Sequence, residues 1–220
     1  MRRMSVVGGV VLAVAMCGGC LQKEVGHTIY VGHGSTTWTV IEREVRSDEK
    51  EAADRIREEH DYFLAAGVGK HPVAEAFRRL GAQTVTTTWL RRERPYAVMT
   101  EARFAGLREL ATAILRDAGA QGDVSLVQSG CDTTFGVQVN VDPALPSAGN
   151  PSTDNAALDA LLTDLESYRF VLANGRFTAA DGFKIQDEGT IAVWDANKAA
   201  VDGLLTLALT WAEEGCIAKR

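Results

Sequence analysis

The chain has 220 residues, of which 46% are hydrophobic and 24% are charged, and this balance is that of an ordinary globular protein. A formal net charge of -6 argues against a nucleic-acid-binding protein, which would be basic overall. A chain of this length is near the upper end of single-domain size and buries about 70% of its unfolded surface when it folds. We therefore expect one folded domain and no nucleic-acid partner.

The first twenty residues have the pattern of an export signal. Met-Arg-Arg-Met is followed by an apolar run over residues 6–16 and then by Cys17-Gly18-Gly19-Cys20. A basic start, a short apolar run and small residues are typical of a signal peptide, and the run is too short to span a bilayer comfortably. The Gly-Gly-Cys step resembles the lipobox of bacterial lipoproteins, although Cys17 stands where that family usually has Leu.

This resemblance implies that residues 1–19 are removed and that Cys20 becomes the lipidated first residue, carrying diacylglycerol and palmitate-type acyl chains. Residues 20–27 would then be a lipidated tether and residues 28–220 a single domain. The protein would be held to a membrane of the bacterial cell envelope through this lipid and would face the periplasm or the cell exterior. An ordinary secretory signal and an uncleaved membrane anchor are the alternatives.

Two further cysteines, Cys131 and Cys216, remain in the mature chain. An exported protein folds in an oxidising compartment, so the pair predicts one disulfide bond. Two buried free thiols are the alternative.

The first part of the domain predicts a hairpin followed by two helices. Residues 28–31 and 36–45 are rich in β-formers and flank Gly32-His33-Gly34-Ser35, which predicts a tight turn. Strands on both sides of Ser35 argue against a nucleophile elbow. Asp48 and Glu51 have the spacing of a capping box, and Pro72 and Gly81 bound a second, short helix. The apolar side of the first helix is expected to hold Ala52, Ala53, Ile56, His60, Phe63 and Leu64.

Residues 83–90 and 96–104 predict a second hairpin with a basic turn. Arg91, Arg92 and Arg94 form the densest positive charge of the mature chain. They are the candidate contact for a phosphate or a lipid headgroup. The alternative is an exposed loop that its charge keeps soluble.

A third helix and a third hairpin follow. Apolar residues from 107 to 115 recur at helical spacing, and residues 123–128 and 134–141 flank Ser129-Gly130-Cys131-Asp132. The second strand alternates between apolar and polar residues, which indicates a sheet covered on one face. If the domain binds an apolar ligand, the pocket is expected between this helix and this strand, lined by Leu107, Leu110, Ile114, Phe135, Val137 and Val139.

The last third predicts a loop over residues 142–155 and a helix beginning at Asp154. Strands follow over residues 168–172, 175–185 and 190–194, and a final helix over residues 197–214. Antiparallel pairs separated by helices predict an α+β fold. We expect the hairpins to form one twisted sheet that amphipathic helices cover on one face.

The glycine steps of this region carry a second resemblance. Asn174-Gly175, Asp181-Gly182 and the run Gly189-Thr190-Ile191-Ala192-Val193-Trp194 resemble LppM-type envelope lipoproteins, a domain of unknown function. The chain departs from that pattern in having Ala173, not proline, before the Asn-Gly step, and in lacking a membrane span in the final helix. The resemblance implies an accessory or ligand-binding module at the envelope surface and supplies no catalytic residues.

Common catalytic and metal-binding motifs are absent from the sequence. It has no HExxH, no P-loop, no GxGxxG that opens a helix and no GxSxG with suitable flanks. We expect no catalytic, metal or cofactor site and therefore a non-enzymatic lipoprotein that binds a partner protein or an apolar, lipid-like ligand. The alternative is a membrane-anchored periplasmic hydrolase whose site is assembled from scattered residues; a buried histidine near Ser or Asp would favour it.

Overall fold

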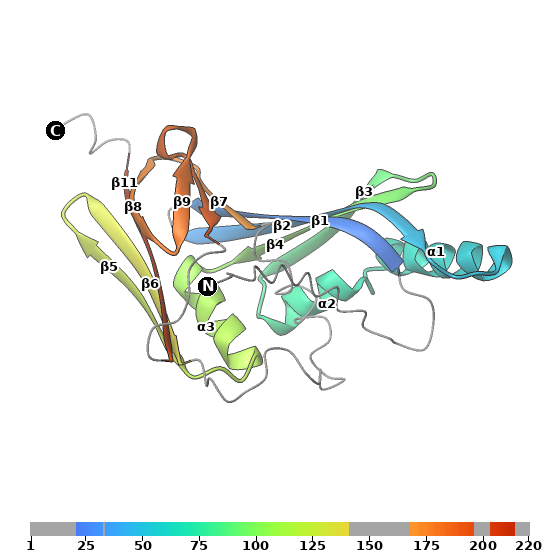
Figure 1. The fold of residues 1–220 in the computed structure, drawn as a ribbon, viewed down its shortest axis with the longest axis horizontal. Coiled ribbons are helices and arrows are strands. Elements are labelled where there is room, and N and C mark those ends of the chain that lie inside the picture. Colours follow the sequence, from blue (N-terminus) through green and yellow to red (C-terminus); the bar gives the residue numbers. More distant parts are fainter. Residues whose placement is uncertain (1–20, 33, 141–167, 196–202, 214–220) are drawn as a thin grey trace, which may run out of the picture.

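The computed structural model of the chain describes residues 21–32, 34–140, 168–195 and 203–213. These residues form two mixed or antiparallel β-sheets and three α-helices, which confirms the predicted α+β class. Figure 1 shows the smaller sheet standing at a steep angle to the larger one, with helix α3 in the corner between them.

The larger sheet has seven strands in the order β3-β4-β2-β1-β7-β10-β9. The first two predicted hairpins are confirmed as the antiparallel pairs β1–β2 and β3–β4. Strand β7 then pairs in parallel with β1, so the last third of the chain extends the sheet. The strands are β1 (Leu21–Gly32), β2 (Ser35–Ser47), β3 (Thr84–Arg91), β4 (Tyr96–Phe104), β7 (Tyr168–Leu172), β9 (Phe183–Gln186) and β10 (Ile191–Trp194).

The smaller sheet has four strands in the order β5-β6-β11-β8. They are β5 (Gly122–Ser129), β6 (Asp132–Asn140), β8 (Arg176–Asp181) and β11 (Leu204–Ala212). The third predicted hairpin is confirmed as β5–β6, but it lies in this second sheet, so the expectation of one sheet was wrong. The chain crosses between the sheets at Gly182, which has a φ of 80° and separates β8 from β9; the 3-10 turn Asp187–Gly189 then leads into β10.

The predicted final helix is wrong where the structure describes it, because Leu204–Ala212 is strand β11. Leu207 and Leu209 pair with Val137 and Phe135 of β6, and both leucines face the core. The rest of that predicted helix, and the helix predicted from Asp154, lie outside the described residues.

The helices α1 (Ala52–Gly67), α2 (Pro72–Arg79) and α3 (Leu107–Asp117) cover the same face of the larger sheet (Figure 1). Pro72 occupies the first turn of α2, as predicted, and Gly81 follows that helix with a φ of 85°. Among the described residues, no helix is both long and apolar enough to cross a bilayer.

Helix α1 is rotated relative to the expectation. Its buried residues are Glu59, Tyr62 and Ala66, whereas Ile56 and Leu64 are half exposed or more. The helix also begins at Ala52 without a side-chain capping bond, so the predicted capping box does not form. The polar face turns inward because the sheet offers it charged and hydrogen-bonding partners, which are described below.

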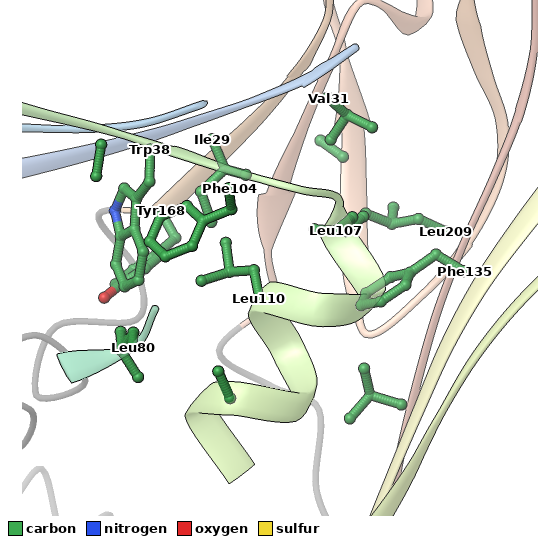
Figure 2. Packing of buried hydrophobic residues seen from close by; sticks show 14 of the residues in the cluster. Ile29, Val31, Trp38, Leu80, Phe104, Leu107, Leu110, Phe135, Tyr168 and Leu209 are labelled. Atoms are coloured by element: carbon green, nitrogen blue, oxygen red, sulfur yellow. The ribbon is translucent and has the colours of Figure 1, made fainter. Parts of the chain in front are cut away.

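The core lies in the corner that the two sheets form with α2 and α3. Trp38, Phe77 and Leu209 are fully buried there, and Leu110 of α3 is 1% exposed. Figure 2 shows α3 directing Leu107 and Leu110 into this cluster. A smaller cluster of Val45, Tyr62, Ala66 and Val98 lies under α1.

The expected tether between Cys20 and the domain is not present in the described residues. Strand β1 begins at Leu21, which pairs with Ser47 of β2 and packs against the smaller cluster. The folded domain therefore starts one residue after the cysteine that is predicted to carry the lipid.

Candidate functional site

The six residues predicted to line an apolar pocket do lie together, but as packed core. Leu107, Leu110, Phe135 and Val137 are all less than 9% exposed, and the two remaining residues, Ile114 and Val139, pack against them. Figure 2 shows Leu107 beside Phe135 at this interface. In the structure these residues therefore form part of the packed core, and none of them lines the larger groove described next.

A groove of about 590 Å³ opens further along the inner face of the same small sheet. We call it the seam groove, because it lies where the turns of the large sheet meet the small sheet. Its apolar floor consists of Val31, Leu172 and Trp211, each less than 9% exposed, and of the more exposed Leu126. The other lining residues are Gly32, Gly34, Gln128, Thr133, Ala173, Asn174 and Glu213.

Local backbone geometry sets the width of the seam groove. Gly175 has a φ of 138°, and a Cβ added there would overlap the carbonyl oxygen of Ala212 at the end of β11. Only glycine therefore lets the β7–β8 turn approach β11 this closely. Asn174, the first residue of the predicted Asn174-Gly175 turn, is exposed and lines the groove together with Trp211.

The described lining residues of the seam groove are mostly uncharged. Glu213 is the ionisable residue among its described lining residues, which include no Lys, Arg or His. Gln128, Thr133 and Asn174 supply polar groups at the rim. An apolar floor with a few polar groups is the usual composition of a small-molecule site, and the volume lies within the usual range.

The arginines predicted to contact an anion are largely engaged inside the protein. Arg91 Nη2 lies 2.7 Å from Glu44 Oε1, and Arg94 makes two bonds to the carboxylate of Glu59. Burial would raise the pKa of Glu59, but the bonds from Arg94 and from the Ser47 N–H outweigh it and lower that pKa. Two of the guanidinium groups therefore hold the β3–β4 turn to β2 and α1.

Arg92 is the third of these arginines and is exposed in the turn. An anion contact at this position stays a prediction, and Arg91 and Arg94, although their side chains are 43% and 49% exposed, are paired with carboxylates of the same chain.

A buried polar network under α1 is the feature that the sequence analysis missed. Glu42 is 1% exposed and accepts hydrogen bonds from the Tyr62 hydroxyl at 2.8 Å and from the Lys23 ammonium. His71 Nε2 lies 3.0 Å from Glu42 Oε2 and 2.7 Å from the Tyr62 oxygen. Burial would raise the pKa of Glu42, but His71 and Lys23 outweigh burial and lower it to about 2.

One signal in the sequence points to this network. In β2, Trp38 and Val40 face the core, and Glu42 follows them at the same two-residue spacing. Strand alternation therefore places its carboxylate inside, where it requires partners. The identity of those partners, on β1, α1 and the start of α2, has no sequence spacing that would reveal it.

The network brings a histidine, a carboxylate and a hydroxyl together, which is the kind of arrangement that a hydrolase would use. His71, Glu42 and Tyr62 are 0%, 1% and 8% exposed, and none of them lines the seam groove. The described structure therefore encloses all three side chains. The network therefore acts in the structure as a link between β1, β2, α1 and α2.

The cysteines are only partly within the described residues. Cys131 lies half-buried in the β5–β6 turn, next to Asp132, which pairs with Ala212 at the end of β11. Cys20 and Cys216 lie outside the described residues. The disulfide bond and the lipidation stay predictions, and the β6–β11 register brings the chain that leads to Cys216 close to Cys131.

Comparisons with known proteins do not assign this chain to a family. No protein-family model and no curated protein matches the chain. Among solved structures, the chain is similar to the NMR structure of the folded domain of the Mycobacterium tuberculosis LppM protein, with 13% identity and a TM-score of 0.35, over 91% of this chain and 94% of that chain. A likeness at this level carries no argument about function.

Among the described residues, no group of three His, Cys, Asp or Glu side chains could hold a metal ion.

Proposed function

We propose that this protein is a lipid-anchored protein of the bacterial cell envelope whose domain binds an apolar, lipid-like ligand in the seam groove without catalysing a reaction. The groove carries this proposal, because an apolar floor of Val31, Leu172, Leu126 and Trp211 opens to solvent at one end of the fold. The Gly-Gly-Cys step at Cys20 supports the anchor.

Adjacent residues of β5 provide a matched test. Leu126 lines the seam groove, whereas Val127 is not among its lining residues and is 58% exposed. We expect Leu126→Asp to weaken binding about tenfold or more, because burying a leucine contributes about 1.5–3 kcal/mol. Val127→Asp should leave binding unchanged.

The measurement is photo-crosslinking of the purified full-length protein with a diazirine-bearing fatty acid, followed by peptide mapping. The proposal predicts crosslinks to β5 and β11 that Leu126→Asp removes and Val127→Asp keeps. Crosslinking that is equal in the wild type and in both variants would overturn it. Turnover in a broad hydrolase substrate screen, abolished by a single His or Ser substitution that leaves the fold intact, would establish the alternative.

A protein partner is the second candidate, because β5 is an edge strand of the small sheet. Its exposed Leu126 and Val127 carry no charge, and the strand contains neither Lys nor Pro, which natural edges use against pairing. An extended peptide that adds to β5 would contact both faces of the sheet. Both Asp substitutions should then weaken capture of the partner, whereas a ligand in the groove is sensitive only to Leu126→Asp.

A further inference from the structure

Helix α1 presents an apolar row to solvent. Ile56, His60, Leu64 and Val68 follow one another at four-residue spacing along α1 and its C-cap, and we call them the α1 ridge. Ile56 is 55% exposed, Leu64 50% and Val68 69%, and His60 is also exposed. Residues four apart lie on one side of a helix, so these side chains form a continuous strip. An amphipathic helix normally packs such a strip against the core.

The orientation of α1 is fixed by its polar face. Glu59 binds Arg94 and the Ser47 N–H, and Tyr62 donates to Glu42 at 2.8 Å. Rotating the helix to bury the α1 ridge would expose these groups and break their bonds, leaving Glu42 without one of its buried donors. The exposed ridge is therefore built into the fold. Figure 1 shows α1 reaching beyond the end of the large sheet.

The first described residue of the chain, Leu21, lies under this helix. Leu21 packs against the smaller cluster, to which α1 contributes Tyr62 and Ala66, and the N–H of its strand partner Ser47 donates to Glu59 of α1. Cys20 is the next residue, and one extended residue spans at most about 3.6 Å. A lipid on Cys20 therefore leaves the domain next to α1, and no tether separates the bilayer from this end of the fold.

From this placement we propose that the α1 ridge lies in the surface of the lipid bilayer, with Ile56, Leu64 and Val68 at the boundary between headgroups and acyl chains. This inference rests on the anchor in the proposed function. Several acyl chains already give a lasting anchor, so the apolar ridge contributes the orientation of the domain on the bilayer and not the attachment itself.

The surroundings of α1 suit such an interface. The ring of Phe63 packs at a tilt against those of Trp89 and Tyr96, with centroid distances of 4.2 Å and 5.2 Å, and Trp and Tyr are enriched at membrane–water boundaries. Leu90, in the same hairpin, is 50% exposed. Helix α1 carries more carboxylates than guanidinium groups, so attraction to anionic lipid does not drive the contact. A zwitterionic bilayer is therefore the appropriate partner for the test.

The test places a tryptophan in the α1 ridge of the full-length, acylated protein reconstituted into phosphatidylcholine vesicles. Leu64→Trp reports on the ridge, and Val127→Trp is the matched control on another exposed aliphatic residue. Figure 1 places β5, which carries the control, at the opposite end of the molecule from α1. The tryptophan fluorescence of each variant is compared with that of the wild type. Both are measured in vesicles with and without phosphatidylcholine that is brominated on its acyl chains.

We expect the emission added by Leu64→Trp to be blue-shifted and mostly lost in the brominated vesicles, while that added by Val127→Trp is unchanged. Equal quenching of the two reporters in protein whose mass shows acylated Cys20 would overturn this inference and leave the anchor standing. A mature protein without acyl mass on Cys20 would overturn the anchor and the inference together. Ligand binding in the seam groove is measured separately and is affected by neither result.

Discussion

Acid should destabilise the domain through His27. This residue of β1 is 2% exposed, its ring stacks on Tyr168 at 4.2 Å, and its Nδ1 accepts a hydrogen bond from Trp38 at 3.3 Å. Burial, with help from Lys23 and against the opposing charge of Glu42, lowers its pKa from 6.5 to about 4. The unfolded chain therefore binds a proton between pH 6.5 and 4 that the folded protein excludes.

The sign and size of the effect follow from this difference in pKa. The contribution of His27 to stability is complete above pH 6.5 and is lost as the pH falls towards 4. It amounts to about 3 kcal/mol over the whole window and about 2 kcal/mol between pH 7 and pH 5. Glu42 acts in a separate, lower window, because its lowered pKa contributes stability that is lost only as the pH falls from 4.5 towards 2.

Urea unfolding at pH 7 and pH 5, followed by tryptophan fluorescence, measures the effect. His27→Phe keeps a ring against Tyr168 but cannot titrate, and it leaves the Trp38 N–H without its acceptor at both pH values. We expect this variant to be less stable at pH 7 but to lose about 2 kcal/mol less than the wild type on going to pH 5. His60→Gln, on the exposed side of α1, controls for the removal of a histidine. Equal losses in the wild type and in His27→Phe would refute the reasoning.

Three further predictions concern the core and the cysteines. Leu110→Ala should lower the free energy of unfolding by about 2–5 kcal/mol, because this side chain is 1% exposed. Leu204→Ala should lower it less, because Leu204 is 37% exposed. The midpoints of urea unfolding of the two variants measure the difference. Cys131 and Cys216 should resist thiol labelling under denaturing, non-reducing conditions, and reduction of their bond should cost roughly 4–5 kcal/mol for a loop of 86 residues counting both cysteines; two reactive thiols per chain would contradict the bond. Cys20→Ala should move the protein to the soluble fraction or leave the precursor uncleaved, and normal processing with unchanged membrane partitioning would contradict the anchor.

Local patterns predicted the hairpins because each is closed by residues that favour a turn. Strands β5 and β6 pair in sequence around Gly130, whose φ is 61°, and the alternation of Phe135 and Val137 correctly gave the buried face of β6. Local sequence patterns could not predict that the hairpins belong to two different sheets. This assignment depends on the parallel pairing of β7 with β1 and on the crossing at Gly182, which are contacts between distant segments.

The wrong prediction of a helix at β11 has a different cause: the spacing of its apolar residues fits both a helix and a strand. Leu204, Leu205, Ala208 and Trp211 fit a helical repeat, but Leu205, Leu207, Leu209 and Trp211 fit a strand equally well. Short apolar runs often allow both interpretations. The neighbouring strands decide between helix and strand. Both β6 and β8 pair with this segment, and Leu209 is completely buried between them. The seam groove depends on this choice, because β11 supplies Trp211 to its floor.

The rotation of α1 shows why the candidate sites were harder to predict than the fold. Hydrophobic periodicity correctly identified the helix and its apolar side, but it assumed that the apolar side faces inward. The buried side is chosen by Glu59 and Tyr62, whose partners Arg94 and Glu42 lie on strands that are distant in the sequence. A buried carboxylate left unpaired costs far more than a few exposed methyl groups, so the polar contacts fix the orientation. An apolar surface that is exposed for this reason is available to a membrane, and Leu21, the residue after Cys20, packs against the cluster under the same helix.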